Sequence, residues 1–355
     1  MSDVKMVMIG DTNVGRADPD SAFASALHLL QDADITFCNL ETVIADAKYC
    51  SQYDRSHLPR TDEWKFAAYL KAGFNVMNQA NNPMTYHGLD PIVRSLEVLD
   101  EAGVVHGGAG RNLAEARKPA IIERNGTKVA FVCRTSVGTP ESAATIDTPG
   151  VARYPVHTIY EAPIRVHSNP GLPPIVRTIP DRGEHRDALV EDITEARKQA
   201  DVVIVSWHWG LSPYQVHPGA GAGEVEVMDY QKEMGHFAID SGADMVIGTH
   251  PHQPQPIEVY KGKAIFYSLA NFVHDLGTFG EMTLMAYLVR CLIRDGKIHR
   301  LSFVPGTIHG HGPPDFTRPS QSPEVVQRFK EMSAPFGTQF EVGEEDVTIV
   351  LGTSS

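Results

Sequence analysis

Short apolar runs alternate with amphipathic stretches along most of the chain, and this alternation limits the possible folds more than any other feature. The runs at 4–10, 34–40 and 127–136 are typical of buried strands. The stretches between such runs carry the spacing of amphipathic helices, which indicates a sheet covered by helices. We therefore expect an α/β fold. No change of composition marks a boundary, so residues 1–355 are interpreted as a single domain.

Two segments depart from this alternation. Residues 140–185 are rich in Pro and Gly, and they form either a decorated surface loop or a lid that binds substrate. After residue 256 the pattern changes to strands and hairpins, whose turns YKGK and RDGK carry the Gly of tight hairpins. Residues 306–355 are expected to be a C-terminal extension of the domain.

Charge and hydropathy exclude several classes of function. The net charge of −13 argues against binding to nucleic acid, which needs a basic surface. No apolar run approaches the roughly 18–20 residues of a membrane helix, and the N-terminus lacks the pattern of a secretion signal. The four cysteines form no CxxC motif, so we expect reduced thiols. The sequence predicts a cytoplasmic protein that binds a small molecule, with homo-oligomerisation left open.

Residues able to bind a metal stand just beyond the ends of five predicted strands. They are Asp11, Asn39 and Glu41, Asn81 and Asn82, His208, and His250 with His252. Ligands of open α/β sheets bind outside the carboxyl ends of the strands, so these side chains should share one edge. Any one of them alone would more simply be a helix cap or a core histidine. Together, carboxylate, amide and imidazole donors without a thiolate suit one or two ions of Mn, Fe or Zn per chain.

The same residues lie in strings that resemble the CapA family of poly-γ-glutamate capsule biosynthesis proteins, which look related to the calcineurin-like metallophosphoesterases. The strings include GDTNVGR (10–16), NLET (39–42), ANN (80–82), VIVSWHWG (203–210) and AIDSGADMVIGTHPHQPQPIEVYKGKAIFYSLANFV (238–273). The last is the most specific. The resemblance implies a four-layer αββα sandwich of the metallo-dependent phosphatase type. It also implies a set of metal ligands, namely Asp11, Glu41, Asn82, His208, His250 and His252.

The chain departs from the family pattern at several positions around this site. The family commonly has His and Asp where Pro83 and Tyr86 stand, and Glu where Ser212 stands. In the phosphoesterases that His helps to protonate the leaving group, which Pro83 cannot do. Asn13 stands at the His of the Asp-x-His motif, so it is either a weaker ligand or the first metal position is incomplete. Ala270 replaces a Gly.

The intact ligands and the altered acid predict a metal-dependent hydrolase. Metal-activated water would attack an amide, lactam or ester bond of a small carboxylate-bearing or γ-glutamyl-like substrate. Two alternatives stay open, a phosphoesterase acting on a small phosphate ester and a non-catalytic polyglutamate-binding or capsule assembly protein. The candidate proton donors, between which the sequence does not choose, are His87, His217 and His274. The candidate substrate-binding residues are Arg16, Arg134, Asn39 and Ser212; Asn39, Ser206 and Asn271 are also candidates for orienting the imidazoles.

Overall fold

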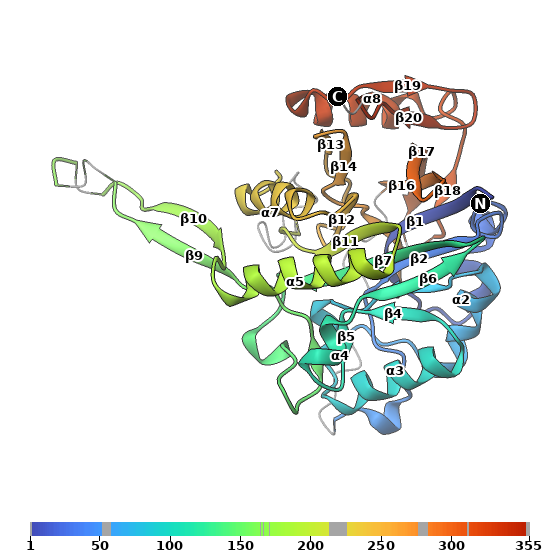
Figure 1. Ribbon diagram of the computed structural model, residues 1–355, viewed down its shortest axis with the longest axis horizontal. Coiled ribbons are helices and arrows are strands. Elements are labelled where there is room, and N and C mark those ends of the chain that lie inside the picture. The colour runs from blue at the N-terminus through green and yellow to red at the C-terminus, as the bar shows by residue number, and fades with distance from the viewer. Residues whose placement is uncertain are drawn as a thin grey trace.

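The computed structural model describes residues 2–51, 58–163, 165, 167–169, 171–212, 226–275, 283–310 and 312–352. Within this part of the chain, two large β-sheets form the centre of the molecule, and helices lie outside them (Figure 1).

The larger sheet contains ten of the described strands, in the order β19-β20-β17-β16-β1-β2-β3-β4, with β15 beside β1 and β18 beside β17. Strands β1 to β4 run parallel to one another, as expected for strands joined by helical crossovers. Their bounds are Val4–Asn13, Ile35–Leu40, Val76–Asn78 and Val105–Gly107. The others are β15 Asn271–His274, β16 Thr283–Arg294, β17 Lys297–His309, β18 Asp315–Phe316, β19 Phe340–Val342 and β20 Val347–Ile349.

The smaller sheet contains six of the described strands, in the order β13-β14-β12-β11-β7-β6. Strands β7, β11, β12 and β14 are parallel neighbours, so their carboxyl ends lie at one edge. The bounds are β6 Ala120–Arg124, β7 Thr127–Thr135, β11 Val202–His208, β12 Met245–Thr249, β13 Ile257–Tyr260 and β14 Lys263–Phe266. The predicted hairpin turn between β13 and β14 is confirmed, with Lys261 and Gly262 at φ 51° and 76°.

The two sheets pack face to face through a common apolar core. Phe37 of β2 stacks on Phe131 of β7 with ring centroids 4.9 Å apart, and Met8, Ile204 and Ile247 belong to the same buried cluster. On the outer faces, helices α1, α2 and α3 cover the larger sheet, and helices α5 and α7 cover the smaller one. Their bounds are α1 Leu27–Leu30, α2 Ala67–Ala72, α3 Asp90–Glu101, α5 Glu184–Gln199 and α7 Asp229–Asp240. The expected αββα sandwich is confirmed.

The two segments that interrupt the sequence pattern have different structures. Within 140–185, β9 (Val156–Glu161) and β10 (Ile175–Pro180) pair into a two-stranded ribbon that projects away from the sandwich in Figure 1. Its role as a lid stays a prediction. The C-terminal residues add β18, β19 and β20 to the larger sheet, with α8 (Pro323–Ser333) packed on the core. They therefore complete that sheet.

Three short elements lie beside the first four strands. Helix α4 spans Leu113–Arg117, and strands β5 (Ala109–Gly110) and β8 (Gly150–Val151) form a small separate pair.

None of the described helices combines the length and the apolar character needed to cross a membrane. The predicted cytoplasmic location and the predicted small-molecule partner stay predictions.

Candidate metal centre

The five strand ends singled out in the sequence meet at one edge of the sandwich. Glu41 directly follows β2, His208 is the last residue of β11, and His250 directly follows β12. Asn82 begins the 3-10 turn Asn82–Thr85 after β3. Asp11 lies within β1, which continues to Asn13 instead of ending at residue 10 as its apolar run suggested.

The last residues of β1 are strand because they pair with β15, a short strand that the sequence pattern did not predict as a separate element. Strand β15 pairs in parallel with the end of β1, placing Asp11 beside Asn271 and Asn13 beside His274. The backbones approach closely, since a Cβ on Gly10 would lie 1.9 Å from the carbonyl oxygen of Ala270. Only glycine fits at position 10, and β15 therefore brings a further histidine to the edge.

Glu41 lies between two groups of possible metal ligands. The inner group is Glu41, His208 and His250, and the outer group is Glu41, His252 and His274. In each group, one ligand atom per residue can be chosen so that all lie within 4.8 Å of one another. The sequence placed His252 with the ligands and His274 with the proton donors, whereas the structure places both rings beside the same carboxylate.

The inner group is completely enclosed. His208 Nε2 lies 2.8 Å from Asn82 Oδ1 and 3.5 Å from Glu41 Oε1, while its Nδ1 lies 3.0 Å from Thr249 Oγ1. The His250 ring meets the His208 ring edge to face, with centroids 4.7 Å apart. Imidazole, carboxylate and amide oxygen thus converge, which is a donor set suited to a transition-metal ion.

The outer group is more open and includes contacts to Asp11. His252 Nδ1 lies 2.8 Å from Asn271 Oδ1 and 3.6 Å from Asp11 Oδ2, and its Nε2 lies 3.8 Å from Glu41 Oε1. His274 Nε2 lies 3.8 Å from Glu41 Oε2. Asn271 therefore fixes the His252 ring through the nitrogen that faces away from Glu41, an orienting contact typical of metal-binding histidines.

Burial sets the protonation of the cluster. It raises the pKa of Glu41 to about 7, with His252 opposing the shift. Burial and then the charge of Glu41 raise the pKa of Asp11 well above its ordinary range. Burial lowers the pKa of His208 and of His250 well below the usual value, so both rings are neutral at pH 7. Neutral imidazole is the form that binds a metal.

Two buried polar groups support the presence of a ligand here. Within the described residues, neither amide atom of Asn13 makes a hydrogen bond, and Glu41 Oε2 accepts none. Both residues are almost completely buried. The lone pairs of Asn13 Oδ1 and Glu41 Oε2 are positions that a divalent cation would fill, because leaving buried polar atoms unsatisfied costs about 1–3 kcal/mol each. The residues therefore fit a metal centre.

Three residues other than Gly have left-handed backbone in the same loops. His250 and His252 have φ of 95° and 57°, and Ala270 has φ of 61°. Residues other than Gly adopt this left-handed region at a cost of about 1–3 kcal/mol, and such strain is commonly found at functional sites. It also explains why a Gly would suit position 270.

Two of the predicted substrate-binding residues act within the site framework. Asn39 is completely buried and donates to Asp11 Oδ1 at 2.6 Å and to Asn81 Oδ1 at 2.8 Å, so it holds the Asp11 carboxylate. Arg16 pairs with Asp275, with Nη2 2.6 Å from Oδ1. Asn39 therefore positions a carboxylate of the cluster, and Arg16 positions Asp275, the residue that follows His274.

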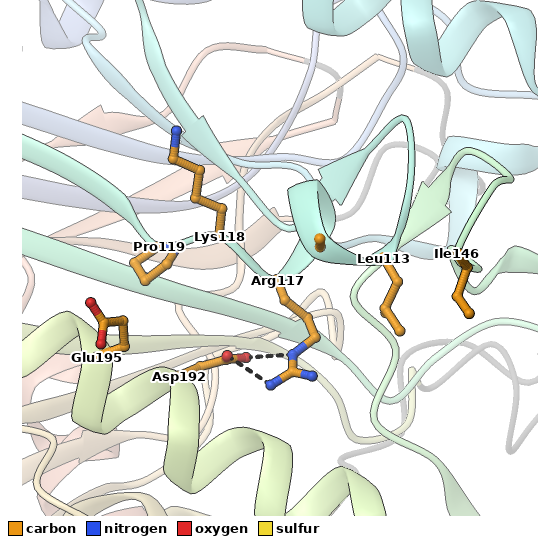
Figure 2. Close-up of a pocket in the computed structure, with 8 residues that line it drawn as sticks. Leu113, Arg117, Lys118, Pro119, Ile146, Asp192 and Glu195 are labelled. Carbon is orange, nitrogen blue, oxygen red and sulfur yellow. Dashed lines mark hydrogen bonds and ion pairs between the residues drawn. The ribbon is translucent and has the colours of Figure 1, made fainter.

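The structure directs Arg134 away from the cluster. Its guanidinium is buried and bonds to Asp192 on α5, which also pairs with Arg117 at 2.9 Å. Figure 2 shows this Arg117–Asp192 pair in a crevice between α4 and α5. A strand residue alternates between faces, and at Arg134 the side chain faces the helix layer. We do not propose Arg134 as a substrate ligand.

Three further candidates from the sequence are His87, Ser212 and His217. His87 is buried, its Nε2 lies 3.1 Å from the carbonyl oxygen of Pro59, and it belongs to neither group of possible metal ligands. Ser212 is buried shortly after β11, at the border of the described residues. His217 lies outside the described residues.

Tyr86 is a site residue that sequence reasoning did not assign. Its hydroxyl accepts a hydrogen bond of 2.6 Å from Asn82 Nδ2, whose other amide atom faces His208. Burial raises the pKa of Tyr86, and the Glu41 charge adds to the shift. The signal in the sequence is a Tyr at the position where the family commonly has Asp.

Comparison with known proteins identifies the family of the chain. Residues 3–276 match the model of the family described as "Bacterial capsule synthesis protein PGA_cap". The chain belongs to this family.

Among its relatives is the PGA biosynthesis protein CapA of Bacillus subtilis (strain 168), 27% identical over 345 residues, covering 95% of this chain and 80% of that protein. The capsule biosynthesis protein CapA of Bacillus anthracis is 29% identical over 327 residues, covering 88% and 69%. A probable polyglutamine synthesis accessory protein of Mycobacterium tuberculosis (strain CDC 1551 / Oshkosh) is 29% identical over 266 residues, covering 73% and 60%. The resemblance stated from the sequence is confirmed.

Proposed function

We propose that this protein is a metal-dependent hydrolase that opens an amide, lactam or ester bond in a small carboxylate-bearing substrate of γ-glutamyl type. The observation that carries the proposal is that four imidazoles surround two buried carboxylates, those of Asp11 and Glu41. Within the described residues, the ion-pair partners of Asp11 and Glu41 are histidines alone. Because no Lys or Arg there balances these carboxylates, a divalent cation is the natural counter-ion.

A divalent cation bound there would lower the pKa of a coordinated water to about 7 and polarise a carbonyl or phosphoryl oxygen. The side chains of this chain supply the rest of the chemistry. Glu41, placed between the two groups, can hold cations on both sides. The contact between Asn82 and His208 fixes the orientation of the imidazole. Asn39 keeps the Asp11 carboxylate in place.

Tyr86 is the residue we propose for protonating the leaving group, the role that Pro83 cannot fill. Its raised pKa keeps the phenol protonated at neutral pH. Its contact with Asn82 places it one residue from the inner group. A phenol gives its proton readily only to a strongly basic leaving group, such as the amine of an amide bond.

The substrate class rests on the relatives. Two of them are named for PGA or capsule biosynthesis, and a third for polyglutamine synthesis. A γ-glutamyl amide carries both the scissile amide and free carboxylates, which agrees with the proposed chemistry. The name of the third relative also supports the alternative of an accessory protein that binds polyglutamate without hydrolysing it. A phosphoesterase acting on a small ester is the other alternative.

Metal-dependent turnover tests these possibilities. Protein stripped with chelator is reloaded with Mn²⁺, Zn²⁺ or Fe²⁺ and given γ-glutamyl-p-nitroanilide, a pyroglutamyl lactam, p-nitrophenyl acetate and p-nitrophenyl phosphate. We expect cleavage of an amide, lactam or carboxylic ester that needs metal and is lost in His208→Ala. The exposed His28→Ala in α1, on the outer face of the larger sheet, serves as the matched control and should keep wild-type turnover. Turnover of the phosphate ester alone would favour the phosphoesterase. Polyglutamate binding without any turnover would favour the accessory protein.

A further inference from the structure

The buried amide of Asn13 marks a second ligand position beside the inner group. Asn13 is 0% exposed on β1, and neither of its amide atoms finds a hydrogen-bond partner within the described residues. A buried Asn of this kind is rare, because most buried polar atoms are satisfied. Something outside the described protein atoms is therefore expected to contact it. Asn13 also stands where the related phosphoesterases have a ligand histidine, so its neighbours decide whether a metal position exists.

Strand β15 places a histidine directly beside Asn13. Asn13 and His274 are paired residues of parallel strands, and the backbone N–H of Asp275 donates to the Asn13 carbonyl oxygen at 3.0 Å. The backbone N–H groups of Gly15 and Arg16 each donate to Asp275 Oδ2 at 2.9 Å. The end of β15 is thus anchored on both sides of its contact with β1, and the position of His274 is well fixed.

The side chains around His274 form the outer group. Its Nε2 lies 3.8 Å from Glu41 Oε2, the oxygen that accepts no hydrogen bond within the described residues. Its ring meets the His252 ring edge to face, with centroids 5.0 Å apart. Ligand atoms about 2.1 Å from one ion lie roughly 3–3.5 Å from each other. The observed separations need only small side-chain shifts to match.

We propose that His274 is a metal ligand which replaces the missing histidine of the Asp-x-His motif from the neighbouring strand. It would complete a second divalent-cation position with Glu41 and His252, with oxygen donors from Asp11 and Asn13. Glu41 would then bridge two ions. His274 is accordingly a metal ligand and not a proton donor, and Arg16 is a positioning residue that acts through Asp275. The inference rests on the proposed function only in sharing Glu41 with the inner group.

Metal content and spectroscopy test the inference without relying on turnover. Metal-free protein is titrated with Mn²⁺, and bound metal is counted by elemental mass spectrometry. We expect two equivalents in wild type and in His28→Ala, and one in His274→Ala. The electron paramagnetic resonance spectrum should show two exchange-coupled ions in wild type and an isolated ion in His274→Ala. The double variant Asn13→His/His274→Ala should regain the second equivalent, because it restores the histidine to the motif position.

Each outcome decides between the inference and the proposed function. Wild-type metal content and a coupled spectrum in His274→Ala would overturn the inference. A single equivalent in wild type, kept in His274→Ala and accompanied by metal-dependent turnover, would overturn the inference and leave the proposed function standing. No binding of any divalent ion would overturn both. Recovery in the double variant supports the inference even if His274→Ala alone is less stable.

Discussion

The inner and outer groups share Glu41 but differ in burial and in origin. His208 and His250 are 0% and 2% exposed, whereas the side chains of His252 and His274 are 12% and 10% exposed. The inner residues and His252 lie within the strings that resemble the family, whereas His274 directly follows the last of these strings. Enclosed ligands are held rigidly by their neighbours, and partly exposed ones are reached by solvent. We therefore expect the inner position to retain its metal and the outer one to exchange it more readily.

The largest expected effect comes from removing the residue that both groups share. Glu41→Gln keeps the shape of the side chain but removes its charge. Turnover should fall by roughly 10³-fold or more, because several kcal/mol of charge stabilisation depend on the bound metal. Metal content should fall at both positions. Elemental analysis together with turnover on the responsive substrate checks this. Retention of the inner ion alone would show that His208, His250 and Asn82 hold it without the shared carboxylate.

Tyr86→Phe should affect chemistry and leave both metal positions intact. If the phenol protonates the leaving group, kcat should fall by about 10²-fold or more while metal content stays at the wild-type level. An activated substrate with a good leaving group should be affected much less than an unactivated amide. The comparison of kcat for the two substrates in wild type and Tyr86→Phe provides the measurement. An equal loss on both would contradict a role in proton transfer.

Asn271→Ala should separate the two groups. Asn271 orients His252 of the outer group and has no comparable contact with the inner histidines in the described structure. Loss of such an orienting contact lowers metal affinity by about 10–100-fold. Competition titrations with a chromophoric chelator should show this change for the weaker ion only. A similar change for the tighter ion would mean that the two positions are not independent.

Acid should weaken metal binding, because the pKa of Glu41 in the metal-free protein is about 7 and that of Asp11 is also raised. Binding displaces these protons, so affinity should fall by up to about tenfold per pH unit for each proton displaced as pH drops below 7. Calorimetric titration between about pH 5.5 and 8 measures this dependence. A pH-independent affinity would show that the carboxylates are already ionised.

The raised pKa of Glu41 makes the metal-free protein more stable in acid, whereas it weakens metal binding in acid. The folded-state pKa of Glu41 lies above its ordinary value of 4.5, so the neutral form is favoured in the folded state. The corresponding stability is present below about pH 4.5 and is lost as pH rises through about 7. Saturating metal should reverse this trend, because the bound cation favours the ionised carboxylate. The lowered pKa values of His208 and His250 act in the opposite direction, since their contribution to stability is lost as pH falls below about 6.5. The contribution of Glu41 is therefore isolated by comparing urea unfolding of wild type and Glu41→Gln at about pH 5 and pH 8, with and without metal.

Much of the fold was predictable because it depends on local pattern. Apolar runs followed by polar strand ends placed Glu41, His208 and His250 at one edge, and the parallel sheets confirm that arrangement. The direction of a long side chain was less predictable. Arg134 also follows an apolar run, yet it faces α5 because its position in the strand alternation and the buried Asp192 decide its direction.

The sequence by itself determined which residue types end the strands, and hence that a cation-binding cluster was expected. Only the tertiary structure decided how those residues divide around Glu41, and that β15 brings His274 to the side of Asn13. The physical reason is that strand formation follows from neighbouring residues, whereas the pairing of β1 with β15 joins segments that lie far apart in the chain. Their register depends on close backbone contacts such as the one between Gly10 and Ala270, which no local pattern encodes.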